Sequence, residues 1–180
     1  RYKKAVESAN DALVLAQHER PAWVGFDPDL RIVGDITLEA PGDMLRNQLE
    51  NGSSARLRWQ AAEALSKRQD LPTVEALGQA LAKKEEAWMV RAEVARALGK
   101  IRGDQALGFL LEATSCEHPK VRRAVAGALG AFRTPKAAKA LEKLARKDRS
   151  YLVTAEALRS LGRTRQKHAL KVLRELMDQK

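Results

Sequence analysis

One ten-residue segment occurs four times in this chain, and this repetition constrains the fold more than any other feature. The copies are Leu-Arg-Trp-Gln-Ala-Ala-Glu-Ala-Leu-Ser (57–66), Val-Arg-Ala-Glu-Val-Ala-Arg-Ala-Leu-Gly (90–99), Val-Arg-Arg-Ala-Val-Ala-Gly-Ala-Leu-Gly (121–130) and Val-Thr-Ala-Glu-Ala-Leu-Arg-Ser-Leu-Gly (153–162). Aligned on Leu65, Leu98, Leu129 and Leu161, they follow one another at intervals of 33, 31 and 32 residues. A self-similar unit of this length is the signature of a repeat architecture.

Each unit has the apolar spacing of two helices joined by a short turn. In the repeated segment, apolar residues recur at steps of three and four, as at Val90, Val94 and Leu98. Further apolar residues follow nine and twelve residues after each anchor leucine, again on one helical face. A glycine directly after the anchor in three units favours a helix end there. Because a two-helix unit cannot bury its apolar faces alone, we expect the units to stack into an α-solenoid.

The motif Val-Arg-x-x-(Ala/Val)-Ala-x-Ala-Leu-Gly resembles the short HEAT-like repeat. Arg58, Arg91 and Arg122 occupy its arginine position, whereas the fourth unit has Thr154. In such repeats this arginine pairs with an acidic residue or with carbonyls of a neighbouring turn, so the resemblance implies a structural arginine ladder that stops at the third unit. We predict a mostly α fold, a HEAT-like αα-superhelix of about four two-helix repeats, at about residues 55–86, 87–118, 119–149 and 150–180.

The N-terminal segment, residues 1–41, differs from the repeats in its pattern. Residues 23–26 (Trp-Val-Gly-Phe) are β-prone, residues 27–29 (Asp-Pro-Asp) have turn chemistry, and residues 30–33 and 35–38 cluster apolar side chains as short strands do. We therefore predict a short β-containing segment over residues 1–41 and a helical repeat domain over residues 42–180. The chain begins with arginine, so we expect it to be an interior piece of a longer protein.

Positive charge is concentrated in the last two units. Residues 119–180 hold 17 Lys/Arg against 5 Asp/Glu, whereas residues 1–118 hold 16 against 18. Such asymmetry indicates a candidate surface for an anionic partner, with the simple solvation of helices as the alternative. The candidate cations are Lys136, Lys139, Lys143, Arg146, Lys147, Lys167, Lys171 and Arg174. Trp59 and Trp88 are candidates for stacking a base or a peptide side chain, unless they fill space between adjacent repeats.

A second resemblance lies at the junction between the N-terminal segment and the repeats. Residues 20–28, the apolar positions at 32, 33 and 36, residues 44–49 and residues 58–65 resemble one segment of the M1 family of zinc aminopeptidases, where a β-sandwich domain meets the helical C-terminal domain. The resemblance implies a non-catalytic scaffold that walls the active-site chamber of a parent enzyme and limits peptide access. Its partners would be the catalytic domain of the same chain and the peptide substrate.

We expect no catalytic or metal-binding residues in the chain itself. M1 catalysis needs His-Glu-x-x-His, but His18-Glu19 has no second histidine at the required spacing. His118 and His168 are also isolated, and Cys116 beside His118 does not by itself make a nucleophile. The chain alone is therefore predicted not to be an enzyme and to hold no cofactor, zinc belonging to the parent. We predict a cytoplasmic location.

Two alternative functions stay open. One is a basic HEAT-like nucleic-acid-binding protein, similar to the alkylbase DNA glycosylases, which the charge of the last two units and the two tryptophans favour; its binding would weaken steeply with salt. The other is a protein–protein scaffold. Nucleic acid is the less favoured partner, and no membrane partner is expected because no apolar run approaches the roughly 18 residues of a membrane span.

Overall fold

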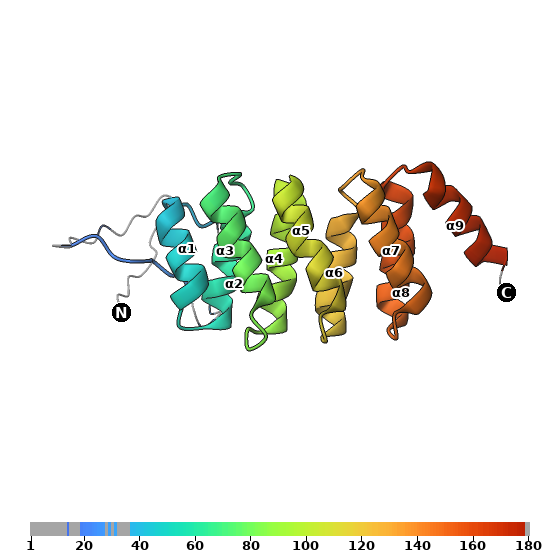
Figure 1. Ribbon diagram of the computed structural model, residues 1–180. Coiled ribbons are helices and arrows are strands. Elements are labelled where there is room, and N and C mark those ends of the chain that lie inside the picture. The colour runs from blue at the N-terminus through green and yellow to red at the C-terminus, as the bar shows by residue number, and fades with distance from the viewer. Residues whose placement is uncertain (1–13, 15–18, 28, 30, 32–36, 179–180) are drawn as a thin grey trace.

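The computed structural model describes residues 14, 19–27, 29, 31 and 37–178 (Figure 1). Within these residues all regular structure is helical, which confirms the predicted α-solenoid. The elements are α1 (Gly42–Asn51), α2 (Ala55–Leu65), α3 (Leu71–Ala82), α4 (Trp88–Ile101), α5 (Asp104–Glu112), the 3-10 helix η1 (Ala113–Ser115), α6 (Pro119–Leu129), α7 (Pro135–Lys147), α8 (Tyr151–Arg163) and α9 (Lys167–Asp178).

The helices form two layers that run the length of the array. The repeated segment makes up α2, α4, α6 and α8, and each of these helices packs on the next. A second layer consists of α1, α3, α5, α7 and α9, with α1 against α2, α3 against α4 and α7 against α8. The pairs α1–α2, α3–α4, α5–α6 and α7–α8 are the first to fourth hairpins of the array. Their turns all lie along the lower edge in Figure 1, at residues 52–54, 83–87, 113–118 and 148–150. We call this edge the turn edge.

Small and branched aliphatic side chains fill one continuous core. The anchor leucines Leu65, Leu98, Leu129 and Leu161 have no exposed surface. A Cβ added to Gly99 would lie 2.8 Å from the Cβ of Ala128, so glycine allows α4 and α6 to approach this closely. The low aromatic content of the chain follows from this packing, because helices at short spacing leave room for alanine, valine and leucine between them.

Helix starts are set by capping side chains. Ser54, Asp70 and Thr134 each accept a hydrogen bond from the amide three residues later, at 3.3, 3.0 and 3.2 Å. Proline in the first turn of α3, α6 and α7 adds a backbone angle that already suits a helix. Ser54 and the proline of α6 fix helix starts at the turn edge, whereas Asp70 and Thr134 fix helix starts at the opposite edge.

The predicted β-containing N-terminal segment is not observed. Residues 23–26 form no strand, and residues 30 and 32–36, which carried most of the other predicted strands, lie outside the described residues. Side chains near α2 hold the described part of this segment: Gln60 Nε2 donates to the Phe26 carbonyl at 3.2 Å, and Arg68 Nη2 donates to the Ala40 carbonyl at 2.9 Å. Side-chain donors, rather than a neighbouring strand, satisfy these two carbonyls.

Candidate functional site

Arg58 clamps the first two turns of the turn edge together. From α2 it donates to the Gly52 carbonyl at 2.6 Å and to both carboxylate oxygens of Glu86, at 2.7 and 2.9 Å. Burial raises the pKa of Glu86, but the hydrogen bonds from Arg58 and from the Ala87 amide outweigh burial and bring this pKa below its usual value. Paired hydrogen bonds of this kind fix orientation as well as distance, so the two turns are held in one relative position.

Arg122 clamps the last two turns in the same way. It donates to the carbonyls of Cys116 and Glu117, at 2.8 and 2.6 Å, and to both carboxylate oxygens of Asp148, at 2.7 and 2.9 Å. The hydrogen bonds from Arg122 lower the pKa of Asp148, and Asp148 in turn raises the pKa of Arg122. Asp148 also accepts from the Ser150 amide at 2.8 Å, which ties the pair to the start of α8.

Arg91 occupies the same repeat position but makes a different contact. Its Nε donates to the Leu81 carbonyl at 2.9 Å, at the end of α3. No carboxylate of the described chain lies within ion-pair distance of Arg91. The arginine at the repeat position therefore joins successive turns in the first and third units and holds a helix end in the second.

The two tryptophans have different surroundings. Trp59 is half-buried against the core, with the Arg56 guanidinium 4.8 Å from its ring. Trp88 opens α4 on the turn edge and stays 40% exposed. The His118 ring stacks on Trp88 with centroids 5.5 Å apart and 7° between planes, and Lys120 Nζ lies 4.1 Å from the Trp88 ring centroid. Of these two predicted stacking residues, Trp88 is therefore the one that a ligand can reach.

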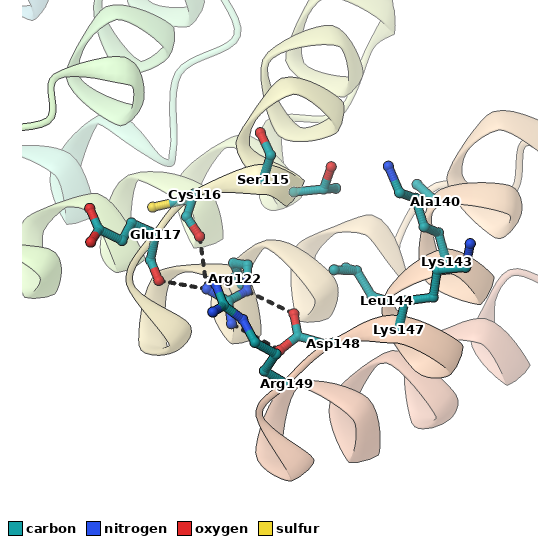
Figure 2. A pocket seen from close by; sticks show the side chains of 11 residues that line it. Ser115, Cys116, Glu117, Arg122, Ala140, Lys143, Leu144, Lys147, Asp148 and Arg149 are labelled. Atoms are coloured by element: carbon teal, nitrogen blue, oxygen red, sulfur yellow. Dashed lines mark hydrogen bonds and ion pairs between the residues drawn. The ribbon is translucent and has the colours of Figure 1, made fainter.

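A pocket of about 250 Å³ lies on the turn edge between the third and fourth hairpins (Figure 2). Its lining consists of Thr114, Ser115, Cys116, Glu117, Arg122, Ala140, Lys143, Leu144, Lys147, Asp148 and Arg149. Arg122 and Asp148 both line the pocket, and their opposite charges neutralise each other. Lys143, Lys147 and Arg149 make no ion pair with any described carboxylate, so the pocket presents net positive charge to a ligand.

The predicted basic patch lies on α7 and α9 and is partly neutralised. Arg146 pairs with Glu142 at 3.0 Å and with Glu175 at 2.7 Å, and His168 Nε2 lies 2.7 Å from Glu142. Hydrogen bonds from His168 and Arg146 lower the pKa of Glu142. The other seven predicted cations are exposed and, in the part of the chain that the structure describes, have no ion-pair partner: Lys136, Lys139, Lys143, Lys147, Lys167, Lys171 and Arg174.

Histidine and cysteine form no metal centre in the described residues, where no three His, Cys, Asp or Glu side chains are grouped to hold an ion. His118 Nδ1 accepts from the Lys120 amide at 3.2 Å and caps α6, and Cys116 is a free, half-buried thiol. His18 lies outside the described residues. No described helix combines the length and apolarity needed to cross a bilayer.

Sequence reasoning missed several residues of the turn edge. Glu86 and Asp148 lie 28 and 26 residues after the arginines they bind, across a whole repeat. Tyr151 and Leu152 are exposed at the start of α8, the repeat position that Trp88 and its neighbour hold in α4. Extending the alignment of the four units toward the N-terminus, past the repeated segment, would have revealed this second correspondence.

The fold and the repeated arginine define an array of helical hairpins of the α-solenoid class. Residues 42–116 and 107–180 match the sequence profile of HEAT repeats, so the chain belongs to the HEAT repeat family. No match was found among curated proteins.

Two solved structures are similar to this chain. Human deoxyhypusine hydroxylase in complex with glycerol is 26% identical, with a TM-score of 0.58 over 76% of this chain and 44% of the hydroxylase. The complex of CpcE and CpcF of phycocyanin lyase from Nostoc sp. PCC7120 is 22% identical, with a TM-score of 0.57 over 82% of this chain and 67% of that one. The chain thus spans less than half the length of the hydroxylase.

The predicted identity as an M1 aminopeptidase domain is wrong. The HEAT repeat profile accounts for residues 42–180, and the similar structures are a hydroxylase and a lyase complex, not an aminopeptidase. The prediction that the chain walls the active-site chamber of a peptidase is therefore withdrawn. The catalytic-domain partner and the zinc of a parent enzyme were implied by the same resemblance, so they have no remaining support. The misleading signal has a physical cause: the leucine-bearing helix and the Arg-x-x-Ala-Ala segment serve helix stacking in this array, and stacking does not depend on the function of the protein.

The prediction that the chain alone is not an enzyme is also overturned. A hydroxylase and a lyase are both built on this fold, so a HEAT array of this kind is compatible with catalysis. The prediction had relied on missing peptidase motifs, and such motifs test only one chemistry.

Proposed function

We propose that this chain is a HEAT-repeat scaffold that binds an acidic surface of a partner protein through its C-terminal half. One observation carries the proposal. Arg146 pairs with Glu142 and Glu175, and His168 contacts Glu142. Seven other exposed cations on α7 and α9 therefore have no described ion-pair partner. Such a field attracts an oppositely charged partner and speeds its encounter with the protein.

The exposed apolar side chains favour a protein partner over a nucleic acid. Trp88, Met89, Tyr151 and Leu152 are exposed on the turn edge, beside the basic half. Aromatic residues and methionine are enriched in protein interfaces, whereas a nucleic-acid surface is mainly polar and cationic. A cytoplasmic location is part of this proposal and is compatible with the free thiol of Cys116.

Charge reversal in two matched variants tests the proposal. The first carries Lys143→Glu, Lys147→Glu and Lys171→Glu; the control carries Lys67→Glu, Lys84→Glu and Lys100→Glu, which are exposed lysines outside α7, α9 and the pocket. The probe is a fluorescein-labelled glutamate-rich 20-residue peptide, followed by anisotropy from low to high salt. We expect the first variant to bind at least about tenfold more weakly, and the control within about twofold of wild type.

Two results would overturn the proposal. Equal losses in both variants would mean that net charge alone, and not the surface of α7 and α9, attracts the peptide. Tighter binding of a single-stranded DNA of the same charge, competing the peptide away, would identify nucleic acid as the partner instead.

A further inference from the structure

We infer that the turn edge from α4 to α8 is a docking surface for an extended, acidic polypeptide segment with two apolar anchors about six residues apart. The inference rests on the proposed function and adds the conformation and residue pattern of the bound segment. Its basis is a regular arrangement: apolar pairs at both ends of the edge and a cationic strip between them.

The two apolar pairs occupy the same repeat position. Trp88 and Met89 begin α4, 40% and 42% exposed, and Tyr151 and Leu152 begin α8, 78% and 44% exposed. Both pairs stand ten and nine residues before the anchor leucines of their units. Single exposed apolar residues are ordinary on a protein surface, but two large pairs at equivalent positions of a stack form a repeated feature of one edge.

The strip between the pairs is cationic. Lys120 begins the intervening helix α6 and lies over the Trp88 ring, and the pocket beyond it exposes Lys143, Lys147 and Arg149. Two carboxylates also line this pocket; Arg122 neutralises Asp148, and Glu117 carries the remaining negative charge. Four cations against one such carboxylate make the strip complementary to an acidic segment.

The spacing of the anchors fixes the length of the segment. Packed helices lie about 8–10 Å apart, so the two steps from α4 through α6 to α8 span about 16–20 Å. An extended chain advances about 3.3 Å per residue, so about five to six residues separate side chains that reach both pairs. A helical ligand about 10 Å wide would need a long groove, whereas the pocket between the anchors, about 250 Å³, suits single side chains.

The edge is held ready for such a ligand. Arg58 ties the turn just before Trp88 to the first turn, and Arg122 ties the turn just before Tyr151 to the turn at residues 113–118. His118 is fixed both by the Trp88 stack and by its hydrogen bond at the start of α6. A surface whose turns are already locked loses little conformational freedom on binding, which favours affinity.

Three labelled twelve-residue peptides and three variants test this inference. The first peptide has phenylalanine at positions 3 and 9 with glutamate between; the second has the same composition with the phenylalanines three residues apart; the third has serine in place of both. The variants of the full chain are Trp88→Ala, Tyr151→Ala and the control Leu71→Ala, an exposed apolar residue at the start of α3. Circular dichroism melts verify that each variant is folded.

We expect the first peptide to bind at least about fivefold more tightly than the other two, and Trp88→Ala and Tyr151→Ala each to remove most of that difference. Leu71→Ala should bind within about twofold of wild type. Equal binding of all three peptides, or wild-type binding by Tyr151→Ala, whose side chain is mostly exposed and outside the core, would overturn the inference.

The charge-reversed α7 and α9 variant separates this inference from the proposed function. If that variant loses binding while Trp88→Ala and Tyr151→Ala retain it, the proposal of an acidic partner is supported and the inference of a docking surface on the turn edge is contradicted. If the charge-reversed variant binds the first peptide as wild type does, the proposed function fails and the inference, which rests on it, fails too.

Discussion

Arg122 and Asp148 join the third and fourth hairpins by two parallel hydrogen bonds of 2.7 and 2.9 Å. Their side chains are 11% and 3% exposed. Arg58 and Glu86 make the same paired contact between the first and second hairpins. The turn edge is therefore built from two clamps of identical chemistry, and loss of either partner would leave a charge with little access to water.

We predict that Asp148→Asn destabilises the array by about 2–3 kcal/mol, because it leaves the Arg122 guanidinium largely buried without its anionic partner. Arg91→Ala, which removes one hydrogen bond to the Leu81 carbonyl, should cost about 1 kcal/mol. Urea unfolding followed by circular dichroism measures both. Equal destabilisation by the two substitutions would mean that the clamp contributes no more than a single neutral hydrogen bond.

Acid should weaken the two clamps, because each clamp needs its carboxylate in the ionised form. The pKa values of Asp148 and Glu86 are lowered in the folded chain, so the native state favours their ionised form. This stability is present above the unfolded pKa values, near 4, and is lost as pH falls through the folded values. The urea midpoint of wild type should therefore drop below about pH 4. The urea midpoint of Asp148→Asn should fall less steeply with decreasing pH than that of wild type. If the two plots of midpoint against pH were parallel, this prediction would be wrong.

The sequence predicts the solenoid well because the signal is steric and recurs. The anchor leucines and the alanines before them must repeat in order to stack, and the anchors have no exposed surface. The strand at residues 23–26 was predicted from residue preference alone, which tertiary contacts can override; Gln60 and Arg68 hold the carbonyls of Phe26 and Ala40 instead.

The candidate site is less predictable because it depends on pairs separated by a whole repeat. Nothing local to Arg122 indicates Asp148, since their register is set by the lengths of α6, α7 and the turns between them. Exposure is likewise a tertiary property. Trp59 and Trp88 both lie near the starts of repeat helices, yet only the second stays open on the turn edge.

Arg146 should control how firmly α9 is attached to the array. It bridges Glu142 on α7 and Glu175 on α9, while Ala169 and Val172 supply the buried contacts of α9. Arg146→Ala should speed amide hydrogen exchange in α9 several-fold, with exchange in α2–α5 unchanged. Glu175→Gln, which removes one arm of the bridge, should have a smaller effect in the same helix. Unchanged exchange in α9 would mean that its apolar contacts alone attach it.

Two glycines should respond in opposite directions to alanine. At Gly99 an added Cβ would lie 2.8 Å from the Ala128 Cβ and 2.9 Å from its Cα, so α4 and α6 must separate, and we expect a loss of about 1–3 kcal/mol. Gly108 lies inside α5 and an added Cβ would meet no atom within 4 Å. Alanine there should stabilise the array by about 0.5–1 kcal/mol, because it favours the helix and restricts the unfolded chain.

Urea unfolding of Gly99→Ala, Gly108→Ala and the double variant measures both effects. The two sites are expected to act independently, so the double variant should lie near the sum of the single changes. Destabilisation by Gly108→Ala would mean that α5 needs the freedom of glycine for motion rather than for space. A neutral Gly99→Ala would mean that the α4–α6 contact yields easily, and that the stack is less tightly packed than its buried leucines indicate.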